Sequence, residues 1–283
     1  MPAYRRVEAT RRALTALREA GSPPVILVDD EGTAGGEELV REFPFVEAVR
    51  TGSAVWWTGA ITLAARRAVG RGDPAVVFYN QDVVCAPDLF DRLGAAADAH
   101  PGALVGCAVA YAHDPGCLWA AGGSIEWWGR GLRGLYHRAP AGDLPAEPFA
   151  VDWLYGMGTF VPRAVFARIG FPDADRFPQA WGDVDFCLRA KAAGIPILVA
   201  PRARLLHEVG AYDPHAAGPP SARLYASWLR DDKHNISLSA HAALWRRHGP
   251  RLLWPLSLLL RVGVLLLNYA RIRVLFPDEA RDE

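Results

Sequence analysis

The chain has 283 residues, of which 51% are hydrophobic and 22% are charged. A chain of this length can bury a core as one large domain or as one domain with an appendage, and this composition excludes intrinsic disorder as its main state. Its 31 basic and 31 acidic residues give a formal net charge of zero, so no overall positive field predicts a nucleic-acid partner.

Segments typical of helices and strands alternate along the first two hundred residues. In chain order, the first part of the pattern predicts a helix over 11–20, a strand over 25–28, a helix over 37–42, a strand over 46–49, a helix over 58–69 and a strand over 75–79. The later part predicts a helix over 87–99, a strand over 104–109, helices over 163–169 and 183–193, and strands over 197–199 and 203–206. Such alternation predicts a mostly parallel sheet with helices on both faces. Residues 111–150, rich in Gly, Trp and Pro, predict hairpins and loops.

Polar side chains follow two of the predicted strands without a gap. Asp29 and Asp30 follow the strand over 25–28, and the run from Asn80 to Asp82 follows the strand over 75–79. In open sheets of this kind, ligands bind outside the carboxyl ends of the strands. Asp82 could hold a hard divalent cation that bridges two phosphates, and the Asp29–Asp30 pair could accept hydrogen bonds from a base or a ribose. Either cluster could instead be a polar turn.

The run from Trp181 to Arg189 places two carboxylates at the start of a predicted helix. Asp183 would lie at the helix N-terminus, where the helix dipole stabilises a negative charge. A base that deprotonates a sugar hydroxyl needs such a carboxylate, so Asp183 is a candidate base, with a helix-capping role as the alternative. Asp185 and Arg189 are four residues apart, and we expect them to form an ion pair along the helix.

An apolar segment lies near the C-terminus. Residues 252–267 read LLWPLSLLLRVGVLLL, interrupted by Pro255 and Arg261. A spanning helix needs about 20 apolar residues, and a central Arg is costly in hydrocarbon, so we expect no membrane span. Two interpretations stay open: a helix pair packed on the domain or on a second copy as a homodimer, or a membrane-surface segment, because arginines and tryptophans surround it. We therefore divide the chain into a domain over 1–245 and a C-terminal segment over 246–283.

The cysteines and the first residues indicate the compartment. The four cysteines show no CxxC or Cys/His spacing, which argues against a zinc site or a disulfide framework. Met1 to Arg6 leads into a charged helical pattern that does not match a signal peptide. We therefore expect a cytoplasmic protein, peripheral on the inner face of a membrane if the C-terminal segment binds lipid.

Five motifs in order resemble the family-two inverting glycosyltransferases of the GT-A fold. The motifs are PAYRR, which looks like the end of their first strand, VILVDDEGTAGG, VVFYNQDVVCAPDLFDRL, VDWLYGMGTFVPRAVFARIG and WGDVDFCLRAKAAGIPILVAPRARLLHEVG. The resemblance covers residues 1–250. Among the subgroups, the chain is most similar to bacterial rhamnosyltransferase-like enzymes of surface-polysaccharide assembly.

The resemblance implies a function and a set of roles. It implies a metal-dependent enzyme that moves a hexosyl group from a nucleoside-diphosphate sugar to a saccharide or lipid-linked acceptor, with inversion and with Mg²⁺ or Mn²⁺ as cofactor. The residues it implies are Tyr4, Asp29, Asp30 and Asn80 for the nucleotide, Asp82 and His207 for the metal, Asp183 as the general base, and Trp153, Gly156, Trp181 and Asp185 for the cleft that holds sugar and acceptor.

Three departures from the family pattern keep other functions open. The first strand is almost absent, Asn80 replaces the first acid of the metal motif, and Gly182 replaces the acid that commonly precedes the base. A non-catalytic sugar-nucleotide-binding partner in an assembly complex is therefore one alternative. A haloacid-dehalogenase-like phosphatase is another, because residues 29–33 approximate its nucleophile motif, although Glu31 replaces the second aspartate of that motif.

Overall fold

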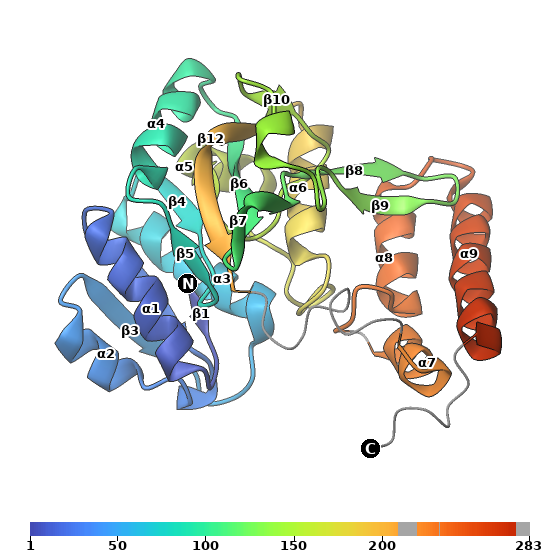
Figure 1. Cartoon of the computed structure of the whole chain (residues 1–283), viewed down its shortest axis with the longest axis horizontal. Helices are drawn as coiled ribbons and strands as arrows, with labels where there is room; N and C mark the ends of the chain where they lie inside the picture. The colour runs from blue at the N-terminus through green and yellow to red at the C-terminus, as the bar shows by residue number, and fades with distance from the viewer. Residues whose placement is uncertain (209–219, 232, 276–283) are drawn as a thin grey trace. The chain divides into compact units, whose positions relative to one another are not determined.

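The computed structural model describes residues 1–208, 220–231 and 233–275, and the chain falls into two compact units (Figure 1). The first, here called the sheet unit, contains residues 1–124, 134–174 and 182–208. The second, here called the helical unit, contains residues 125–133, 175–181 and the described residues after 208. Each unit is described separately below.

A three-stranded parallel sheet begins the sheet unit. Its order is β1–β2–β3, formed by β1 (Pro2–Ala3), β2 (Val25–Asp29) and β3 (Val46–Arg50). β2 is buried at all five positions, as its continuous apolar run predicts. β1 is only two residues long and pairs in parallel with the end of β2, with Ala3 opposite Asp29. The predicted short first strand is therefore present, and it ends beside the first acidic cluster.

The second sheet is mixed rather than mostly parallel. Its order is β10–β12–β6–β11–β4, with β5 paired to β12 and β7 paired to β6; the bounds are β4 (Ala75–Phe78), β5 (Val83–Cys85), β6 (Leu104–Tyr111), β7 (Asp114–Ala120), β10 (Phe149–Ala150), β11 (Thr159–Pro162) and β12 (Ile197–His207). β6 and β12 are parallel, whereas β11 is antiparallel to both β4 and β6. The residue pattern alone does not predict β11, because four residues between glycines and a helix show no clear two-residue period; the family resemblance places a Gly-rich strand there, before Arg163.

β12 joins two strands that the sequence analysis predicts separately. Its pairing with β6 shifts register between Ala200 and Arg204, around Pro201. Proline has no N–H to donate to the ladder, so the pairing is interrupted there and resumes three residues later. The continuation carries His207 to the end of the strand, where it lies opposite Val83 of β5.

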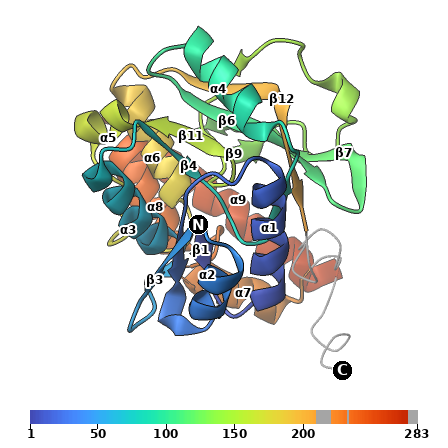
Figure 2. The same cartoon turned by 90° about the vertical axis from the view of Figure 1, so that its left-hand side faces the viewer.

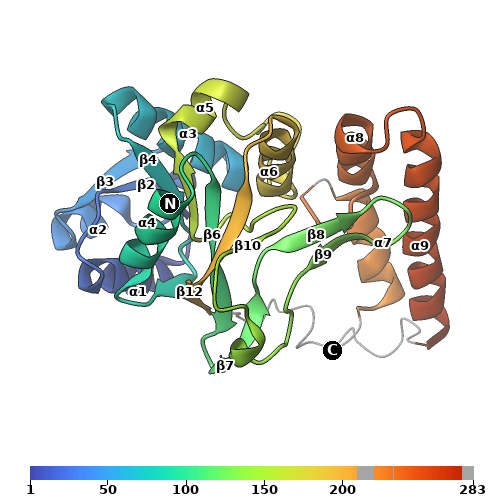
Figure 3. The ribbon, with the colours of Figure 1, turned by 90° about the horizontal axis from the view of Figure 1, so that it is seen from above.

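Helices cover both faces of the second sheet. The helices of this unit are α1 (Val7–Glu19), α2 (Gly36–Glu42), α3 (Trp56–Arg71), α4 (Leu89–Ala99), α5 (Arg163–Ile169) and α6 (Gly182–Ala192), with short 3₁₀ turns at Asp30–Gly32 and Ala141–Asp143. Figures 1 and 3 show α4 on one side of β6 and β12 and α6 on the other. Figure 2 shows α1 and α3 beside the first sheet. The six predicted helices are confirmed, although α1 begins four residues before its predicted start.

Hairpins and a helical cluster complete the described chain. Residues 111–150 form β7, the two-stranded β8 (Gly123–Glu126) and β9 (Gly131–Gly134), and β10, so the prediction of hairpins is confirmed. The helical unit contains α7 (Ala222–Arg230), α8 (Leu238–His248) and α9 (Trp254–Leu275), and α9 packs along α8 and α7 (Figure 3). No helix in the described ranges has the length and apolar character that crossing a membrane requires.

Candidate functional site

Asp29 organises the loop that follows β2. Its Oδ1 accepts a hydrogen bond from the Ala34 N–H at 2.7 Å, and its Oδ2 accepts one from the Gly36 N–H at 3.0 Å. The side chain is buried, and a Cβ at Gly36 would lie only 3.0 Å from Oδ2. Both carboxylate oxygens are therefore engaged by backbone amides. This geometry does not present Asp29 as the free nucleophile that a haloacid-dehalogenase-like phosphatase needs.

Asp30 fixes the start of α3. Its Oδ1 accepts hydrogen bonds from the Thr51 hydroxyl at 2.9 Å and the Val55 N–H at 3.0 Å, and its Oδ2 accepts one from the Trp56 N–H at 3.2 Å. Trp56 has a φ of +56°, a left-handed conformation that costs a non-glycine residue free energy. The buried Asp30 carboxylate helps to hold this turn, and a nucleotide contact through Asp30 stays a prediction.

Gln81 ties the end of β1 to the segment that follows β4. Its Oε1 accepts hydrogen bonds from the Tyr4 N–H and the Thr10 hydroxyl, both at 3.0 Å, and its Nε2 donates to the Tyr4 carbonyl at 3.2 Å. Tyr4 is 37% exposed as a residue, with the Arg5 guanidinium 4.8 Å from the centroid of its ring. Tyr4 is thus held by its backbone, and its ring is free to contact a ligand. Gln81 lies in the predicted cluster from Asn80 to Asp82, but the sequence assigned it no role of its own.

Asp82 and His207 meet at the ends of distant segments, as their predicted shared role requires. The Asp82 Oδ2 lies 3.8 Å from the His207 Nε2 and 3.6 Å from the Arg6 guanidinium. The His207 Nδ1 is buried and finds no hydrogen-bond partner among the described residues, while the edge of Trp119 packs against the ring with 4.9 Å between centroids. Arg6 and Trp119 were missed by the sequence analysis.

This pair fits a divalent cation. Imidazole nitrogen and carboxylate oxygen both bind Mn²⁺, and Mg²⁺ in proteins often uses one or two carboxylates together with substrate phosphates. The described residues contain no group of three or more His, Cys, Asp or Glu side chains close enough to share a metal. In a metal site here, Asp82 and His207 would supply two ligands, and phosphates and water would supply the others.

Trp57 connects Asn80 to the loop before β11. Its indole N–H donates to the Asn80 Oδ1 at 2.8 Å. The same ring packs against Gly156, where an added Cβ would lie 1.9 Å from ring atoms. Only glycine fits under this ring, and the sequence analysis places Gly156 in the cleft without a reason for the glycine. Trp57 itself was missed, because nothing local distinguishes it from a core tryptophan.

Asp183 lies in the first turn of α6 with both carboxylate oxygens hydrogen-bonded. Its Oδ2 accepts from the Gly156 N–H and its Oδ1 from the Val184 N–H, both at 2.8 Å. Burial raises the pKa of the Asp183 carboxyl above its usual range, and these two hydrogen bonds oppose that effect. The geometry is therefore compatible with both roles considered for Asp183, helix capping and general base. A raised pKa suits a group that must accept a proton near neutral pH.

The sequence comparison assigns the family. The family model of glycosyl transferase family 2 matches residues 1–147, which span β1 to the segment before β10 and include Tyr4, Asp29, Asn80 and Asp82. The chain belongs to glycosyl transferase family 2. None of the curated proteins compared with the chain matches it significantly. The matched part ends before Asp183 and His207, so the roles of these two residues rest on the geometry above and on the resemblance.

A solved structure supports the fold of this family-2 chain. The chain is similar to the crystal structure of GalNAc-T7 with UDP, GalNAc and Mn²⁺, with a TM-score of 0.55 and 12% sequence identity. The alignment covers 93% of this chain and 52% of that one, so the chain spans about half the length of its structural neighbour. At this identity the likeness shows the fold alone, and the family-2 chain has the GT-A fold.

Two predicted cleft residues of the family-2 chain are buried in internal contacts. Asp185 is fully buried, and its Oδ2 accepts a hydrogen bond from the Arg189 Nε at 2.9 Å, so the expected ion pair is present. Trp153 is 4% exposed, covers Gly123, and donates its indole N–H to the Ser124 carbonyl at 3.3 Å. Both residues therefore support the walls of the sheet unit.

Trp181 belongs to the helical unit of the family-2 chain. It has a φ of +67°, and the edge of its ring packs against His241, with 5.8 Å between the ring centroids. Its indole N–H is buried and has no hydrogen-bond partner within the described part of the chain. Such backbone strain persists only where the surrounding structure enforces it. A sugar contact through Trp181 stays a prediction.

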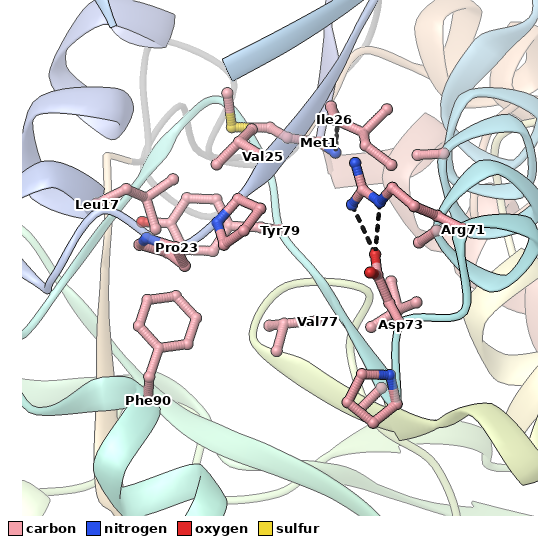
Figure 4. Close-up of a pocket in the computed structure, with 16 residues that line it drawn as sticks. Met1, Leu17, Pro23, Val25, Ile26, Arg71, Asp73, Val77, Tyr79 and Phe90 are labelled. Atoms are coloured by element: carbon pink, nitrogen blue, oxygen red, sulfur yellow. Dashed lines mark hydrogen bonds and ion pairs between the residues drawn. The ribbon is translucent and has the colours of Figure 1, made fainter. Parts of the chain in front are cut away.

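An apolar cavity of about 310 Å³ lies beside β2 and β4 (Figure 4). Its walls include Val25 at the start of β2, Val77 of β4 and Phe90 of α4, and the ion pair between Arg71 and Asp73 lies at one side. The acidic clusters follow the carboxyl ends of β2 and β4. Tyr79, next to Asn80, lines this cavity, but none of the predicted site residues does. The cavity is therefore not part of the candidate site.

Proposed function

We propose that the chain is an inverting, metal-dependent glycosyltransferase. It moves a hexosyl group from a nucleoside-diphosphate sugar to a saccharide or a lipid-linked acceptor. The observation that carries the proposal is the proximity of Asp82 and His207, whose side chains lie 3.8 Å apart. Asp82 belongs to the part of the chain that the family model matches. We assign the transferase domain to residues 1–245 and the membrane-surface or dimer contact to 246–283.

Asp82 and His207 would hold Mg²⁺ or Mn²⁺ in this proposal. The cation would neutralise the negative charge that builds up on the diphosphate as it leaves. Arg6 lies 3.6 Å from Asp82 and about half exposed, so its guanidinium can turn from the carboxylate to a phosphate oxygen when the donor binds. Asn80, a neutral acceptor, leaves the site with one carboxylate fewer than the Asp-x-Asp pattern.

Asp183 is the proposed base. Its carboxylate takes the proton from the acceptor hydroxyl while the acceptor oxygen attacks the anomeric carbon. The new bond forms on the face opposite the diphosphate, the bond from the anomeric carbon to the diphosphate oxygen breaks with its electron pair going to the diphosphate, and the configuration inverts. Gly156 positions the carboxylate through its N–H. Tyr155 beside it is a half-buried phenol whose pKa is raised by desolvation and by the charge of Asp183.

The biological setting is proposed from the resemblance and from the C-terminal segment. Similarity to the rhamnosyltransferase-like enzymes supports a role in bacterial surface-polysaccharide synthesis. The basic, leucine-rich C-terminal segment supports a peripheral location on the inner face of the membrane, where lipid-linked acceptors are made. The donor base and the sugar are then decided by experiment.

Thermal unfolding with added nucleotides tests the proposal. UDP, dTDP, GDP and ADP are each added with Mn²⁺ or with EDTA. A ligand at about 100 times its Kd stabilises the folded state by ~2.7 kcal/mol, which is roughly a 5–10 °C rise in Tm for a chain of this size. We expect such a rise with one pyrimidine diphosphate and Mn²⁺, and its loss in EDTA.

Matched variants sharpen this test. Asp82→Asn should abolish the Mn²⁺-dependent rise, while Asp88→Asn, which alters an exposed carboxylate paired with Arg92, should keep it. No rise with any nucleotide would contradict the proposed site. A rise without any transfer of sugar to polysaccharide acceptors would instead favour the non-catalytic binding partner.

A further inference from the structure

One face of α9 exposes an unusual number of leucines. Leu256, Leu259, Leu260, Leu266, Leu267 and Val274 are spaced three, four or seven residues apart, which places them on one side of a helix, and we call them the leucine face. Their exposed fractions run from 46% for Leu260 to 78% for Val274. Exposed apolar patches of this kind on a folded protein mark an interaction site.

The opposite side of α9 is already occupied. Ser257 and Leu265 are buried there, and the Ser257 hydroxyl accepts a hydrogen bond from the Trp245 indole N–H at 2.9 Å. The Leu265 carbonyl accepts from the Tyr225 hydroxyl at 3.4 Å. The leucine face is thus the side of α9 that points away from α7 and α8. The contacts that hold α9 to these helices come from its other side.

Arg261 does not interrupt the leucine face. Its Nε donates to the His241 Nε2 at 3.2 Å, and one terminal nitrogen donates to the Arg130 carbonyl at 3.0 Å. The arginine therefore points to the packed side of α9. In the sequence it breaks the apolar run, but in space it leaves the leucines continuous, and the cost of placing a central arginine in a lipid environment does not arise.

Within residues 233–277, the segment that contains the leucine face, every charged side chain is basic. Residues 233–277 contain no Asp or Glu and seven Lys or Arg, in a chain whose formal net charge is zero. Arg246, Arg247, Arg251, Arg271 and Arg273 are all exposed. Exposed leucines flanked by arginines are complementary to a bilayer with anionic lipids. The leucines can enter the apolar acyl region, and the arginines can contact the anionic headgroups.

We propose that the leucine face binds the surface of an anionic bilayer, with α9 lying in the plane of the headgroups. The helix is about 33 Å long at 1.5 Å per residue, and its packed side keeps it attached to α7 and α8, so it lies on the bilayer and does not cross it. Two copies meeting through this face would bring like charges together, which disfavours a second copy as the occupant. The inference deepens the proposed peripheral location, because it names the binding face and the lipid charge, and it does not depend on the proposed transfer reaction.

Sedimentation with vesicles tests the docking surface. The full chain is mixed with vesicles of phosphatidylcholine alone, or of equal parts phosphatidylcholine and phosphatidylglycerol, without nucleotide. We expect binding to the anionic vesicles that weakens with added salt, because salt screens the arginines. Leu259→Gln combined with Leu267→Gln should reduce the partition coefficient at least tenfold. The control Leu63→Gln, at a 41% exposed leucine of α3, should bind like the parent chain.

Two further measurements keep the test decisive. Arg271→Gln combined with Arg273→Gln should weaken binding and flatten its salt dependence, which checks the charge contribution without touching a leucine. Absence of binding to anionic vesicles, or an equal loss in Leu63→Gln, would overturn the proposal. A dimer in sedimentation velocity that the leucine variants dissociate, without vesicle binding, would assign the face to a second copy instead. Nucleotide-dependent stabilisation is measured on the same samples, so failure of docking and failure of the transferase site are distinguishable.

Discussion

Asp183 combines burial, a helix N-terminus and two backbone donors around one carboxylate. The donors from Gly156 and Val184 orient the carboxylate, while burial makes its ionised form less favourable. These influences oppose one another, and burial has the larger effect on the pKa. A base tuned in this way is protonated over a wider acidic range than an ordinary aspartate, which gives a measurable consequence.

The pH dependence of sugar transfer should report the Asp183 carboxyl. Because its pKa is raised, the carboxyl is protonated in the native protein at pH values where a free aspartate is ionised, and transfer should decline on the acidic side of that raised pKa. We expect kcat/KM to rise with pH through this value. Asp183→Asn should lower kcat by about 10² to 10⁴, the usual contribution of a general base, while nucleotide binding is kept.

An exposed aspartate provides the control for this prediction. Asp98→Asn on α4 should leave both the rate and its pH profile unchanged. If Asp183→Asn kept the acidic limb of the profile, or lost nucleotide binding along with transfer, the carboxylate would have a structural role instead.

Two elements meet tightly at Trp57 and Gly156. The α3 indole occupies the space that a side chain at Gly156 would need, and Gly182 has a similar relation to α3, since a Cβ there would lie 2.1 Å from the Thr58 hydroxyl oxygen. The Thr58 hydroxyl is buried without a hydrogen-bond partner among the described residues. A side chain at Gly182 would therefore collide with α3 in this structure.

Gly156→Ala should destabilise the protein through this contact. Overpacking a rigid site costs about 1–3 kcal/mol, so we expect a lower urea midpoint and slower transfer, because the Asp183 partner moves. Trp57→Phe removes the ring atoms that the new Cβ would meet. In a double-mutant cycle, the double variant should therefore be more stable than the sum of the single effects predicts.

Gly70→Ala is the matched control on the same helix. No heavy atom of the described residues lies within 4 Å of an added Cβ at this position, and alanine favours a helix over glycine by about 1 kcal/mol. We expect this variant to be as stable as the parent chain or more so. Additive effects of Gly156→Ala and Trp57→Phe would show that the two residues do not press on one another.

The predicted elements agree with the structure where local pattern is sufficient. The buried strand over 25–28 and the helix over 163–169 are recovered because each carries its own apolar run or capping signal. The local pattern did not reveal β11, which is too short to show a period. The second sheet is mixed and not mostly parallel, because strand direction depends on which neighbours a strand meets. Asp82 and His207 were paired only through the family resemblance, since neither residue signals its partner. The structure brings their side chains to 3.8 Å, and their shared metal role stays a prediction.

At the scale of the whole molecule, charge is distributed unevenly although it sums to zero. The acidic clusters belong to the sheet unit, while the described helices of the helical unit carry the arginines around α9. Inside the helical unit, His241 is buried with its Nδ1 2.8 Å from the Ser237 carbonyl and its Nε2 accepting from Arg261. Only the neutral ring satisfies both contacts.

Acid should unfold the chain partly through His241. Burial, aided by the charge of Arg261, lowers the pKa of His241 to about 4 from an ordinary value of 6.5. Between these values the unfolded chain binds a proton that the native chain does not. The free energy of unfolding therefore falls as pH drops from about 6.5 to 4, by up to about 3 kcal/mol, and this contribution is constant above pH 7.

Urea unfolding across this pH range checks the assignment. His241→Gln should be less stable at neutral pH and should lose most of the decline between pH 6.5 and 4. His100→Gln, at an exposed histidine, should follow the parent chain at every pH. An unchanged acid dependence in His241→Gln would assign the decline to other groups.

The sequence by itself determined the order of the elements, the family and the residue types at the strand ends. Apolar periods and helix-capping residues act over a few positions, so a short stretch of sequence is sufficient to predict an element from them. The tertiary structure decided which of these residues meet: Asp82 with His207, Trp57 with Gly156, and Arg261 with His241. Contacts of this kind depend on strand order and on the volume between packed elements, which no local pattern records. For the same reason, the apolar segment interrupted by Arg261 in the sequence becomes a continuous leucine face in space.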